Sequence, residues 1–276
     1  MRKQIMEKNN IQISFESKEG MSPVASVHLA IFIGQTGVGK STTLEILSKN
    51  NPNLVLLPDR RTLTDLVIIP QALKLQKLDD VIVADRVRRF ELTKFYREKI
   101  SSAGMANVLN TIYIEESKND RLFLFDGLRG ENEIRYAVSK FPKAHFIMLD
   151  APDFIRVQRL IQRRSSFDMV DKKSVSSSEK FLKSYTEIGL PQGDKFFDKD
   201  EVTILLNLVN TRVVELEDLL SKTKIVLKES ENYSPKKARA VLKSEATNRS
   251  LIIDTSKNKP DEVARLITKY LESIKW

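Results

Sequence analysis

The segment that decides the fold is Val27–Ser41, VHLAIFIGQTGVGKS, in a chain of 276 residues. Its first part, Val27–Ile33, is a compact apolar and β-branched run, which is typical of a buried parallel strand. Gly34–Ser41 follows directly and fits the pattern G-x-x-x-x-G-K-[ST], and Thr42–Asn50 then has the pattern of a helix. A strand, a glycine-rich turn and a helix in this order predict an α/β fold with a phosphate-binding loop (P-loop).

The residue types in this loop have separate chemical tasks. Glycines allow backbone angles at which successive N–H groups point inward and surround phosphate oxygens, and the helix that follows adds the positive end of its dipole. Lys40 is expected to reach the β- and γ-phosphates, and the Ser41 hydroxyl to coordinate Mg²⁺. The residues expected to bind a nucleoside triphosphate are Gly34, Gln35, Thr36, Gly37, Val38, Gly39, Lys40, Ser41 and Thr42.

Further apolar runs alternate with helical patterns along the chain. The expected strands are Leu54–Leu57, Arg121–Phe125, His145–Leu149 and Leu251–Ile253. The expected helices include Glu131–Lys140, Asp153–Arg164 and Pro260–Lys275, and most of Pro70–Thr111. This alternation predicts a P-loop NTPase fold, an α/β three-layer sandwich with a parallel sheet covered on both faces, plus a helical insertion.

The expected domain organisation is a core with additions. Residues 1–25 form an N-terminal extension or a short leading strand, and residues 26–165 form the P-loop core, with a helical insertion at about 62–113. Residues 166–246 form a loop and a helical insertion or lid, in which the apolar stripe of Glu201–Leu220 is typical of a core or a helix-pair seam. Residues 165–180 are predicted to be a mobile loop, and residues 247–276 complete the core.

Asp126 ends the apolar run RLFLF. Ligands gather at the carboxyl ends of parallel strands, so this carboxylate is expected in the Mg²⁺ shell opposite Ser41. The alternative is an ordinary turn or helix-capping aspartate.

Asp59, Arg60 and Arg61 follow the second expected strand. Asp59 is a candidate to accept or orient the hydroxyl proton of a phosphoryl acceptor, while Arg60 or Arg61 holds an anionic group of it. A turn after Pro58 is the alternative. Arg89 lies with two further arginines before the third strand, where a solvated helix face is expected from the sequence alone.

Arg156, Arg159 and Arg163 are spaced by three and four residues, so they are expected on one helix face. Beside a mobile loop, these arginines could close over the γ-phosphate and exclude water, which suppresses hydrolysis. The alternative is again a solvated helix face.

The arrangement resembles the nucleoside-monophosphate-kinase-like group of P-loop kinases, which includes adenylate, gluconate and polynucleotide kinases. The matching segments are Gly34–Thr42, Asp59–Arg61, Phe125–Arg129, and Met148–Pro152 with the arginines after it. Phe125–Arg129 is similar to the Asp-Gly-Phe-Pro-Arg segment of adenylate kinases, without the proline and with the arginine one position early. The resemblance implies ATP and Mg²⁺ as cofactors and Arg129 as a further substrate-binding residue. It also implies that the helical insertion at about 62–113 binds the acceptor and that Arg89 is one of its substrate-binding residues.

Other P-loop classes fit less well. A GTPase needs Asp-x-x-Gly where Asp126 is followed by Gly127, Leu128 and Arg129, and the Asn-Lys-x-Asp at 258–261 lies four residues beyond Asp254. That segment is expected to be the proline-initiated start of a helix, which favours ATP. The leading hypothesis is a kinase acting on a nucleotide, a nucleic-acid end or a small phosphorylated metabolite. A nucleotide-dependent switch or ATPase, with a protein or nucleic-acid partner at residues 166–246, and a scaffold without turnover remain alternatives.

Composition narrows the remaining choices. The chain has no cysteine and only two histidines, His28 and His145, so thiolate metal sites are excluded and histidine-rich ones disfavoured. No apolar run approaches the roughly 20 residues of a membrane span, and the N-terminal residues do not resemble a signal peptide, so a cytoplasmic protein is expected. The net charge of +9 fits either an anionic partner or a solvated lysine-rich surface.

Overall fold

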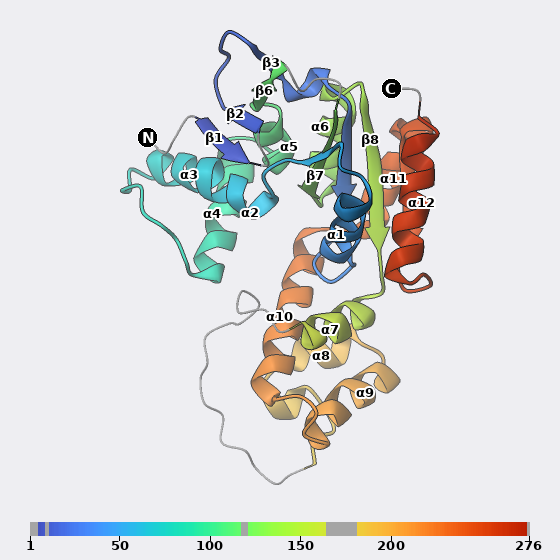
Figure 1. Cartoon of the computed structure of the whole chain (residues 1–276). Helices are drawn as coiled ribbons and strands as arrows, with labels where there is room; N and C mark the ends of the chain where they lie inside the picture. The colour runs from blue at the N-terminus through green and yellow to red at the C-terminus, as the bar shows by residue number, and fades with distance from the viewer. Residues whose placement is uncertain (1–4, 9–10, 117–120, 164–180, 275–276) are drawn as a thin grey trace. The chain divides into compact units, whose positions relative to one another are not determined.

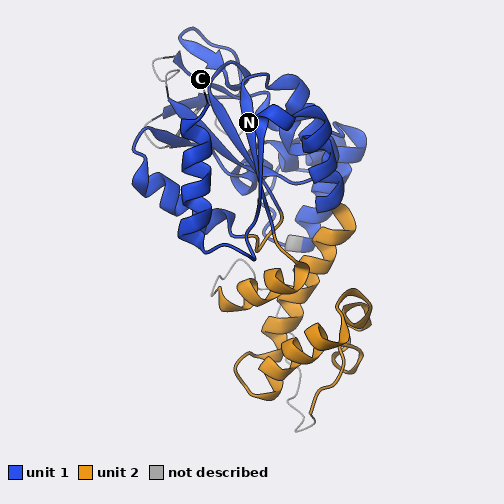
Figure 2. Cartoon of the chain, turned by 90° about the vertical axis from the view of Figure 1, so that its right-hand side faces the viewer, with its two compact units in different colours: residues 1–34, 39–150, 234–276 blue, residues 35–38, 151–233 orange. Residues whose placement is uncertain are grey.

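The structure, a computed structural model, describes residues 5–8, 11–116, 121–163 and 181–274 (Figure 1). The loop expected at 165–180 lies outside the described residues. The chain forms two compact units (Figure 2): unit 1 comprises residues 1–34, 39–150 and 234–276, and unit 2 comprises residues 35–38 and 151–233. No helix within the described part of the chain has the length and apolar character needed to cross a membrane.

Unit 1 is built on a five-stranded sheet in which all neighbouring strands are parallel. Its order is β5 (Leu54–Leu56), β7 (Leu122–Leu128), β4 (Leu29–Ile33), β8 (Ala144–Asp150) and β9 (Ser250–Asp254). The central strand β4 is buried throughout, as its apolar run predicts. The α/β fold with a parallel sheet is therefore confirmed, and the first expected strand begins two residues later than the apolar run.

Helices cover both faces of this sheet (Figure 2). One set is α1 (Lys40–Asn50) and α12 (Pro260–Glu272), which contact each other. The other set is α5 (Gly104–Leu109), α6 (Glu131–Lys140) and α11 (Pro235–Glu245), in which α6 contacts both neighbours. Ile31 of β4 shares one buried apolar cluster with Ile134 of α6 and Val241 of α11. These layers form the three-layer sandwich of a P-loop NTPase fold.

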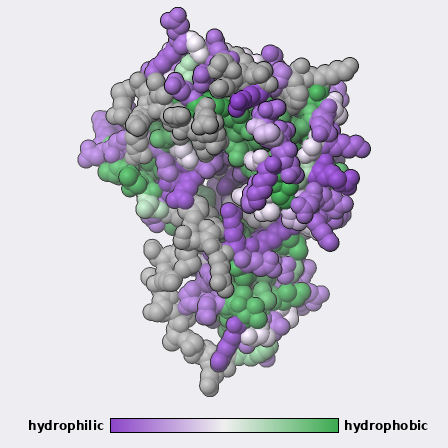
Figure 3. All heavy atoms as spheres, viewed as in Figure 1, coloured by the Kyte–Doolittle hydropathy of each residue, from purple (hydrophilic) through white to green (hydrophobic). Residues whose placement is uncertain are grey.

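The residues between β5 and β7 form α2 (Arg60–Leu63), a π-helical turn (Thr64–Ile68), α3 (Ile69–Leu75), α4 (Arg86–Lys99) and then α5. Most of this segment is helical, as expected. Several large apolar side chains are exposed where α3 is joined to α4: Leu75, Leu78, Val81, Ile82 and Val87. On the face seen in Figure 3, a further group of hydrophobic residues lies over the helices of unit 2, among residues that are mostly hydrophilic.

A second, antiparallel sheet joins the N-terminal residues to the end of this segment. Its order is β1 (Ile5–Lys8), β2 (Ile11–Ser14), β6 (Tyr113–Glu115) and β3 (Met21–Pro23), and a 3-10 turn at Val24–Ser26 leads to β4. Ile11 and Ile13 are buried in the main apolar cluster of unit 1. The first 25 residues are therefore more than an extension, because they supply three strands of this sheet.

Unit 2 contains α7 (Asp153–Gln162), a 3-10 turn (Thr186–Ile188), α8 (Pro191–Phe196), α9 (Lys199–Asn210) and α10 (Leu216–Asn232). Its core joins Val157 and Leu160 of α7 to Leu205 and Leu206 of α9 and Val226 of α10. Helices continue to Glu245, as expected, but the last of them, α11, belongs to unit 1, so unit 2 ends at Tyr233 and not at residue 246.

The apolar stripe of Glu201–Leu220 does not lie on one helix. Helix α9 ends at Asn210, and Arg212 has a left-handed φ of 57° that interrupts the helical backbone. Val213 is consequently 71% exposed, whereas Leu205 and Leu206 are buried. Helical spacing alone could not reveal the break, because the apolar residues continue in α10 at the same period.

Candidate functional site

The P-loop begins where β4 ends and finishes where α1 begins. Gly34 and Gly39 have φ values of 151° and 95°, and Gly39 is the residue before α1. A φ of 95° favours glycine, because a side chain there would collide with the backbone. The Lys40 ammonium donates to the Gly34 carbonyl over 2.8 Å, so the lysine folds back over its own loop.

Lys40 also lies beside Asp126, with its Nζ 3.8 Å from Oδ1. Asp126 is inside β7, not at its end: the strand continues to Leu128, and its pairing with β4 shifts by one residue between Phe32 and Ile33. The expected strand end at Phe125 is therefore wrong by three residues. The irregular pairing is a bulge of the kind that redirects a side chain near a functional site.

A surface cavity of about 530 Å³ lies at this edge of unit 1. Its polar lining includes Ser41 of α1, Asp59 after β5 and Asp126 of β7, and Leu44, Leu56 and Leu124 supply apolar lining. The structure thus brings the two expected Mg²⁺ ligands and the expected acceptor-activating carboxylate to one cavity. Mg²⁺ is usually bound by one or two protein groups together with phosphate oxygens and water, and Ser41 with Asp126 fits that donor set.

The cavity offers no richer metal site. The described residues contain no group of three or more His, Cys, Asp or Glu side chains that could hold a metal ion. A metal at this position would therefore depend on oxygens of the bound phosphates for much of its coordination shell.

Asp59 also begins α2. Its Oδ1 accepts a hydrogen bond of 2.8 Å from the Thr62 N–H, so it is the N-cap of that helix. The turn that was the alternative for Asp59 is therefore present. The residue nevertheless lines the cavity and is exposed, so the cap leaves a carboxylate at its edge.

Arg60 does not line the cavity. Its guanidinium forms a two-point ion pair with Glu133 of α6, with Nη1 2.9 Å from Oε2 and Nη2 2.8 Å from Oε1, and it also donates to the Gly127 carbonyl. Glu133 is 1% exposed, and it accepts further hydrogen bonds from the backbone N–H groups of Met105 and Arg129. The structure therefore places the expected substrate-binding arginine in a buried structural pair.

Glu133 is ionised in this environment. Burial alone would raise the pKa of Glu133, but the adjacent Arg60 charge and the hydrogen bonds from Arg60, Arg129 and Met105 outweigh burial and hold that pKa below its ordinary value. The pair is therefore fully charged at neutral pH, and both charges are needed for it to be stable.

The other arginines expected to bind substrate also lie outside the cavity lining. Arg89 of α4 pairs with Asp65 and donates to the Val83 carbonyl over 3.1 Å. Arg61 is exposed on α2, and the backbone of Arg129 is held by Glu133. Their positions in the sequence predicted contact with an acceptor, but could not show that Arg89 pairs with Asp65 across the fold.

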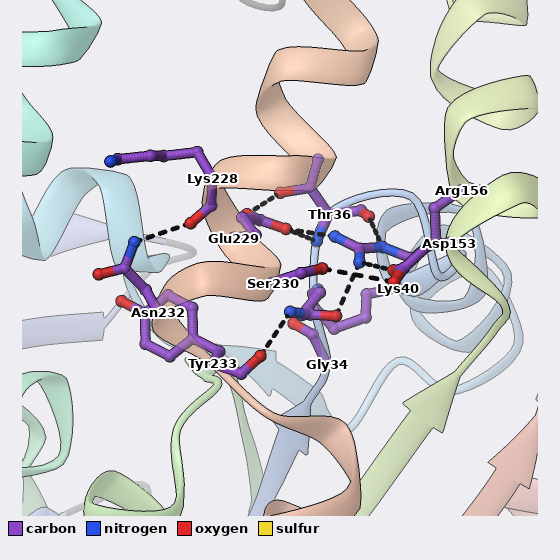
Figure 4. A network of polar contacts seen from close by, with 11 residues as sticks. Gly34, Thr36, Lys40, Asp153, Arg156, Lys228, Glu229, Ser230, Asn232 and Tyr233 are labelled. Atoms are coloured by element: carbon purple, nitrogen blue, oxygen red, sulfur yellow. Dashed lines mark hydrogen bonds and ion pairs between the residues drawn. The ribbon is translucent and has the colours of Figure 1, made fainter. Parts of the chain in front are cut away.

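In unit 2, the P-loop residues Gln35–Val38 are held by α7 and α10 (Figure 4). Arg156 of α7 is fully buried. Its Nε donates to the Thr36 carbonyl over 2.8 Å, its Nη1 to the Gln35 Oε1 over 2.7 Å, and its Nη2 pairs with Glu229 over 2.6 Å. It also pairs with Asp153. Arg156 was expected either to close over the γ-phosphate or to lie on a solvated helix face, but it is buried and every guanidinium nitrogen is bound within unit 2.

Glu229 of α10 is the acid that completes this network. It is fully buried, its Oε2 accepts the Thr36 N–H over 2.8 Å, and its Oε1 accepts the Thr36 hydroxyl over 2.5 Å. Sequence reasoning missed Glu229. A signal was present, since Glu229 follows Ile225 and Val226 by four and three residues and so lies on the apolar face of its helix, where an unpaired charge is very costly.

Arg159 and Arg163 are in different environments from Arg156. The Arg159 Nη1 donates to the Gly37 carbonyl over 3.4 Å, so this side chain lies at the P-loop. Arg163 follows the last residue of α7 and has an extended backbone. The three arginines therefore do not share one helix face, because the helix ends before the third of them.

Comparisons with known proteins give only distant similarities. No family model and no curated protein matches the chain. Solved structures that match include shikimate kinase from Acinetobacter baumannii, with a TM-score of 0.36, 14% identity and coverage of 91% of this chain and 96% of that one. Deoxyadenosine kinase from M. mycoides matches with a TM-score of 0.35 and 12% identity, over 89% of this chain and 99% of that one. TT1252 from Thermus thermophilus matches with a TM-score of 0.44 and 14% identity, over 91% of this chain and 99% of that one. The class of the chain, a P-loop NTPase fold, follows from its own sheet and loop.

Proposed function

We propose that this chain is an ATP- and Mg²⁺-dependent phosphotransferase. The observation that supports this most directly is the cavity at which Ser41, Asp59 and Asp126 meet, directly beside the first turn of α1. A loop that binds phosphate serves any P-loop protein, but a cavity with an additional exposed carboxylate gives room for an acceptor.

The residues have distinct roles in this proposal. Lys40 and the backbone N–H groups of Gly37–Thr42 bind the phosphates, and Ser41 and Asp126 would hold Mg²⁺, which neutralises the phosphate charge. Asp59 accepts the proton of the acceptor hydroxyl as its oxygen bonds to the γ-phosphorus and the bond from that phosphorus to the β–γ bridging oxygen breaks. Arg159, at the Gly37 carbonyl, supplies positive charge for the transition state.

ATP is the proposed nucleotide because the Asn-Lys-x-Asp segment at 258–261 is the start of a helix. Helix α12 begins at Pro260, and the Asn258 amide donates to the Asp254 carbonyl over 2.8 Å. The proposed acceptor is a nucleotide, a nucleic-acid end or a small phosphorylated metabolite, with Arg61 and Arg129 as its candidate anion-binding residues. The net charge of +9 is consistent with anionic ligands.

Transfer of label from γ-labelled ATP to a panel of acceptors tests this function. Lys40→Ala should abolish both nucleotide binding and transfer, since it removes the charge beside the phosphates. Lys94→Ala is the matched control, because Lys94 is an exposed lysine paired only weakly with Glu98 over 3.8 Å. Label that appears only as free phosphate with every acceptor would exclude a kinase.

That result would favour the second candidate, an ATPase that acts as a switch. One observation supports it: the P-loop residues Gln35 and Thr36 are bound by helices of unit 2, so a partner of those helices could alter the loop. The switch predicts hydrolysis that a protein or nucleic acid stimulates.

A further inference from the structure

The P-loop is held by two opposite charges that are both removed from water. Arg156 and Glu229 are each 0% exposed, and together they make hydrogen bonds to the carbonyl, N–H and hydroxyl of Thr36 and to the side chain of Gln35 (Figure 4). A buried ion pair rarely adds stability over a well-packed apolar pair, because both charges lose their hydration. The stability of unit 2 alone therefore does not account for the buried pair of Arg156 and Glu229.

The contacts are directed at the loop and not only at the neighbouring helix. The Gln35 side chain links the network onward to the Tyr233 carbonyl over 3.1 Å. Gly37 lies against α7 so closely that a Cβ at this position would be 2.9 Å from the Arg156 carbonyl oxygen. Residues 35–37 are therefore fixed by α7 and α10 on both sides of Thr36.

Contacts that hold the P-loop in one conformation offset the loss of backbone freedom in its glycines. Gly37 has a φ of 88°, and glycine is the residue that loses most conformational freedom when its backbone is fixed. A loop that is already held in one conformation binds its ligand more tightly, because the ordering cost does not fall on the binding step. A carboxylate beside a polyphosphate would by itself oppose binding, but Arg156 neutralises Glu229.

We infer that Glu229 and Arg156 are positioning residues for the nucleotide: they fix Gln35–Gly37 from α10 and α7 in the conformation that accepts phosphate. This inference rests on the proposed nucleotide binding and deepens it. It also assigns α10 a role in nucleotide affinity that its distance in sequence from the P-loop does not suggest.

The test is calorimetric titration of the full chain with Mg·ATP. Glu229→Gln keeps the shape of the side chain but removes the charge that holds Arg156, and it should weaken ATP binding about tenfold, the effect of losing one charged hydrogen-bonding partner. Unchanged or tighter binding would overturn the inference. If the carboxylate acted only by repelling the phosphates, Glu229→Gln would tighten ATP binding, so the direction of the change separates positioning from repulsion.

Asp194→Asn is the matched control. Asp194 is a carboxylate of the same unit that accepts the backbone N–H groups of Tyr185 and Thr186, each over 2.7 Å. None of its hydrogen bonds goes to residues 35–38. This variant should lower thermal stability and leave the ATP dissociation constant unchanged. An equal loss of affinity in both variants, at temperatures where both are folded, would show a merely structural role.

Thr36→Val keeps the inference testable if Glu229→Gln does not fold. It removes only the hydroxyl that donates to Glu229 over 2.5 Å and should weaken ATP binding about threefold. No loss in Thr36→Val would contradict the inference. Absence of any heat with the unaltered protein would reject nucleotide binding itself, and with it this inference, whereas normal binding by all variants would reject only the positioning role.

Discussion

Arg60 and Glu133 form a two-point ion pair that joins α2 to α6, with side chains that are 12% and 2% exposed. Glu133 also binds the N–H groups of Met105 and Arg129, so one carboxylate holds the start of α2, the start of α5 and the turn after β7. This part of unit 1 is therefore organised around a charge that the sequence pattern does not mark.

Replacing Glu133 by Gln should lower the free energy of unfolding by about 3 kcal/mol, because the Arg60 charge remains buried without its counter-charge. Urea unfolding followed by circular dichroism measures this change. Glu245→Gln is the control, since Glu245 pairs with the largely exposed Arg135 and should contribute at most about 1 kcal/mol. Equal effects in the two variants would contradict the assigned burial.

The same carboxylate predicts a dependence of stability on acid. The pKa of Glu133 is held below its ordinary value of 4.5, because Arg60 and the backbone hydrogen bonds outweigh the opposing effect of burial. A group whose folded pKa is lowered stabilises the fold fully above its unfolded pKa and loses that contribution as pH falls through the folded value. The unfolding free energy should therefore fall below pH 4.5, and Glu133→Gln should lack that part of the slope. If the unfolding free energies of the unaltered protein and of Glu133→Gln fell in parallel with pH, the lowered pKa of Glu133 would be refuted.

Asp59→Asn separates the two roles of Asp59, as the N-cap of α2 and as the proposed general base. Asparagine also caps helices, so the hydrogen bond to Thr62 and the stability should be kept. The amide cannot accept a proton, so turnover should fall by about 10²–10⁴-fold if Asp59 is the general base. Steady-state kinetics together with thermal melting measures both properties. A loss of stability with unaltered turnover would assign Asp59 a capping role only.

Arg159 and Arg163 should differ although both were expected to contact the γ-phosphate. Arg159→Gln should lower kcat by about 10³-fold with little change in ATP affinity, as expected for a charge that stabilises the transition state. Arg163 lies beyond α7, so Arg163→Gln should have a much smaller effect. Similar losses in both variants would show that Arg163 also reaches the phosphates.

Gly37→Ala should disrupt the loop more than a comparable change elsewhere. Its φ of 88° disfavours alanine, and the new Cβ would meet the Arg156 carbonyl oxygen at 2.9 Å. Gly189→Ala is the control, because Gly189 also has a positive φ, of 75°, but has no atom within 4 Å of the added carbon. Nucleotide affinity and melting temperature should both fall further for Gly37→Ala, and equal effects would exclude the close contact.

The sequence was sufficient for the features that depend on local pattern. Apolar runs predicted the strands of the parallel sheet, and the glycine spacing predicted the loop between β4 and α1. Pro260 correctly predicted the start of a helix, although the Asn-Lys-x-Asp segment around it matches a guanine-binding motif. These predictions succeeded because the period of a strand, a turn and the N-terminus of a helix are each determined by a few neighbouring residues.

Features that depend on distant partners could not be predicted in this way. The strands β3 and β6 have three residues each, too few to show a period, and they pair across about ninety residues of sequence. In the sequence, Arg60 and Arg156 look like arginines that bind a ligand. Only the fold shows that they pair with Glu133 and Glu229. Tertiary pairing therefore decides whether an arginine near a P-loop is accessible to a ligand.

The contact between Thr36 and Glu229 spans 193 positions of the chain. During synthesis the P-loop is thus made long before the carboxylate that binds it, and β9 and α12 follow later still. A ribosome-bound chain that has not yet reached α10 carries the complete phosphate-binding motif but lacks its internal support. The protein cannot assemble this part of itself in the order in which it is translated.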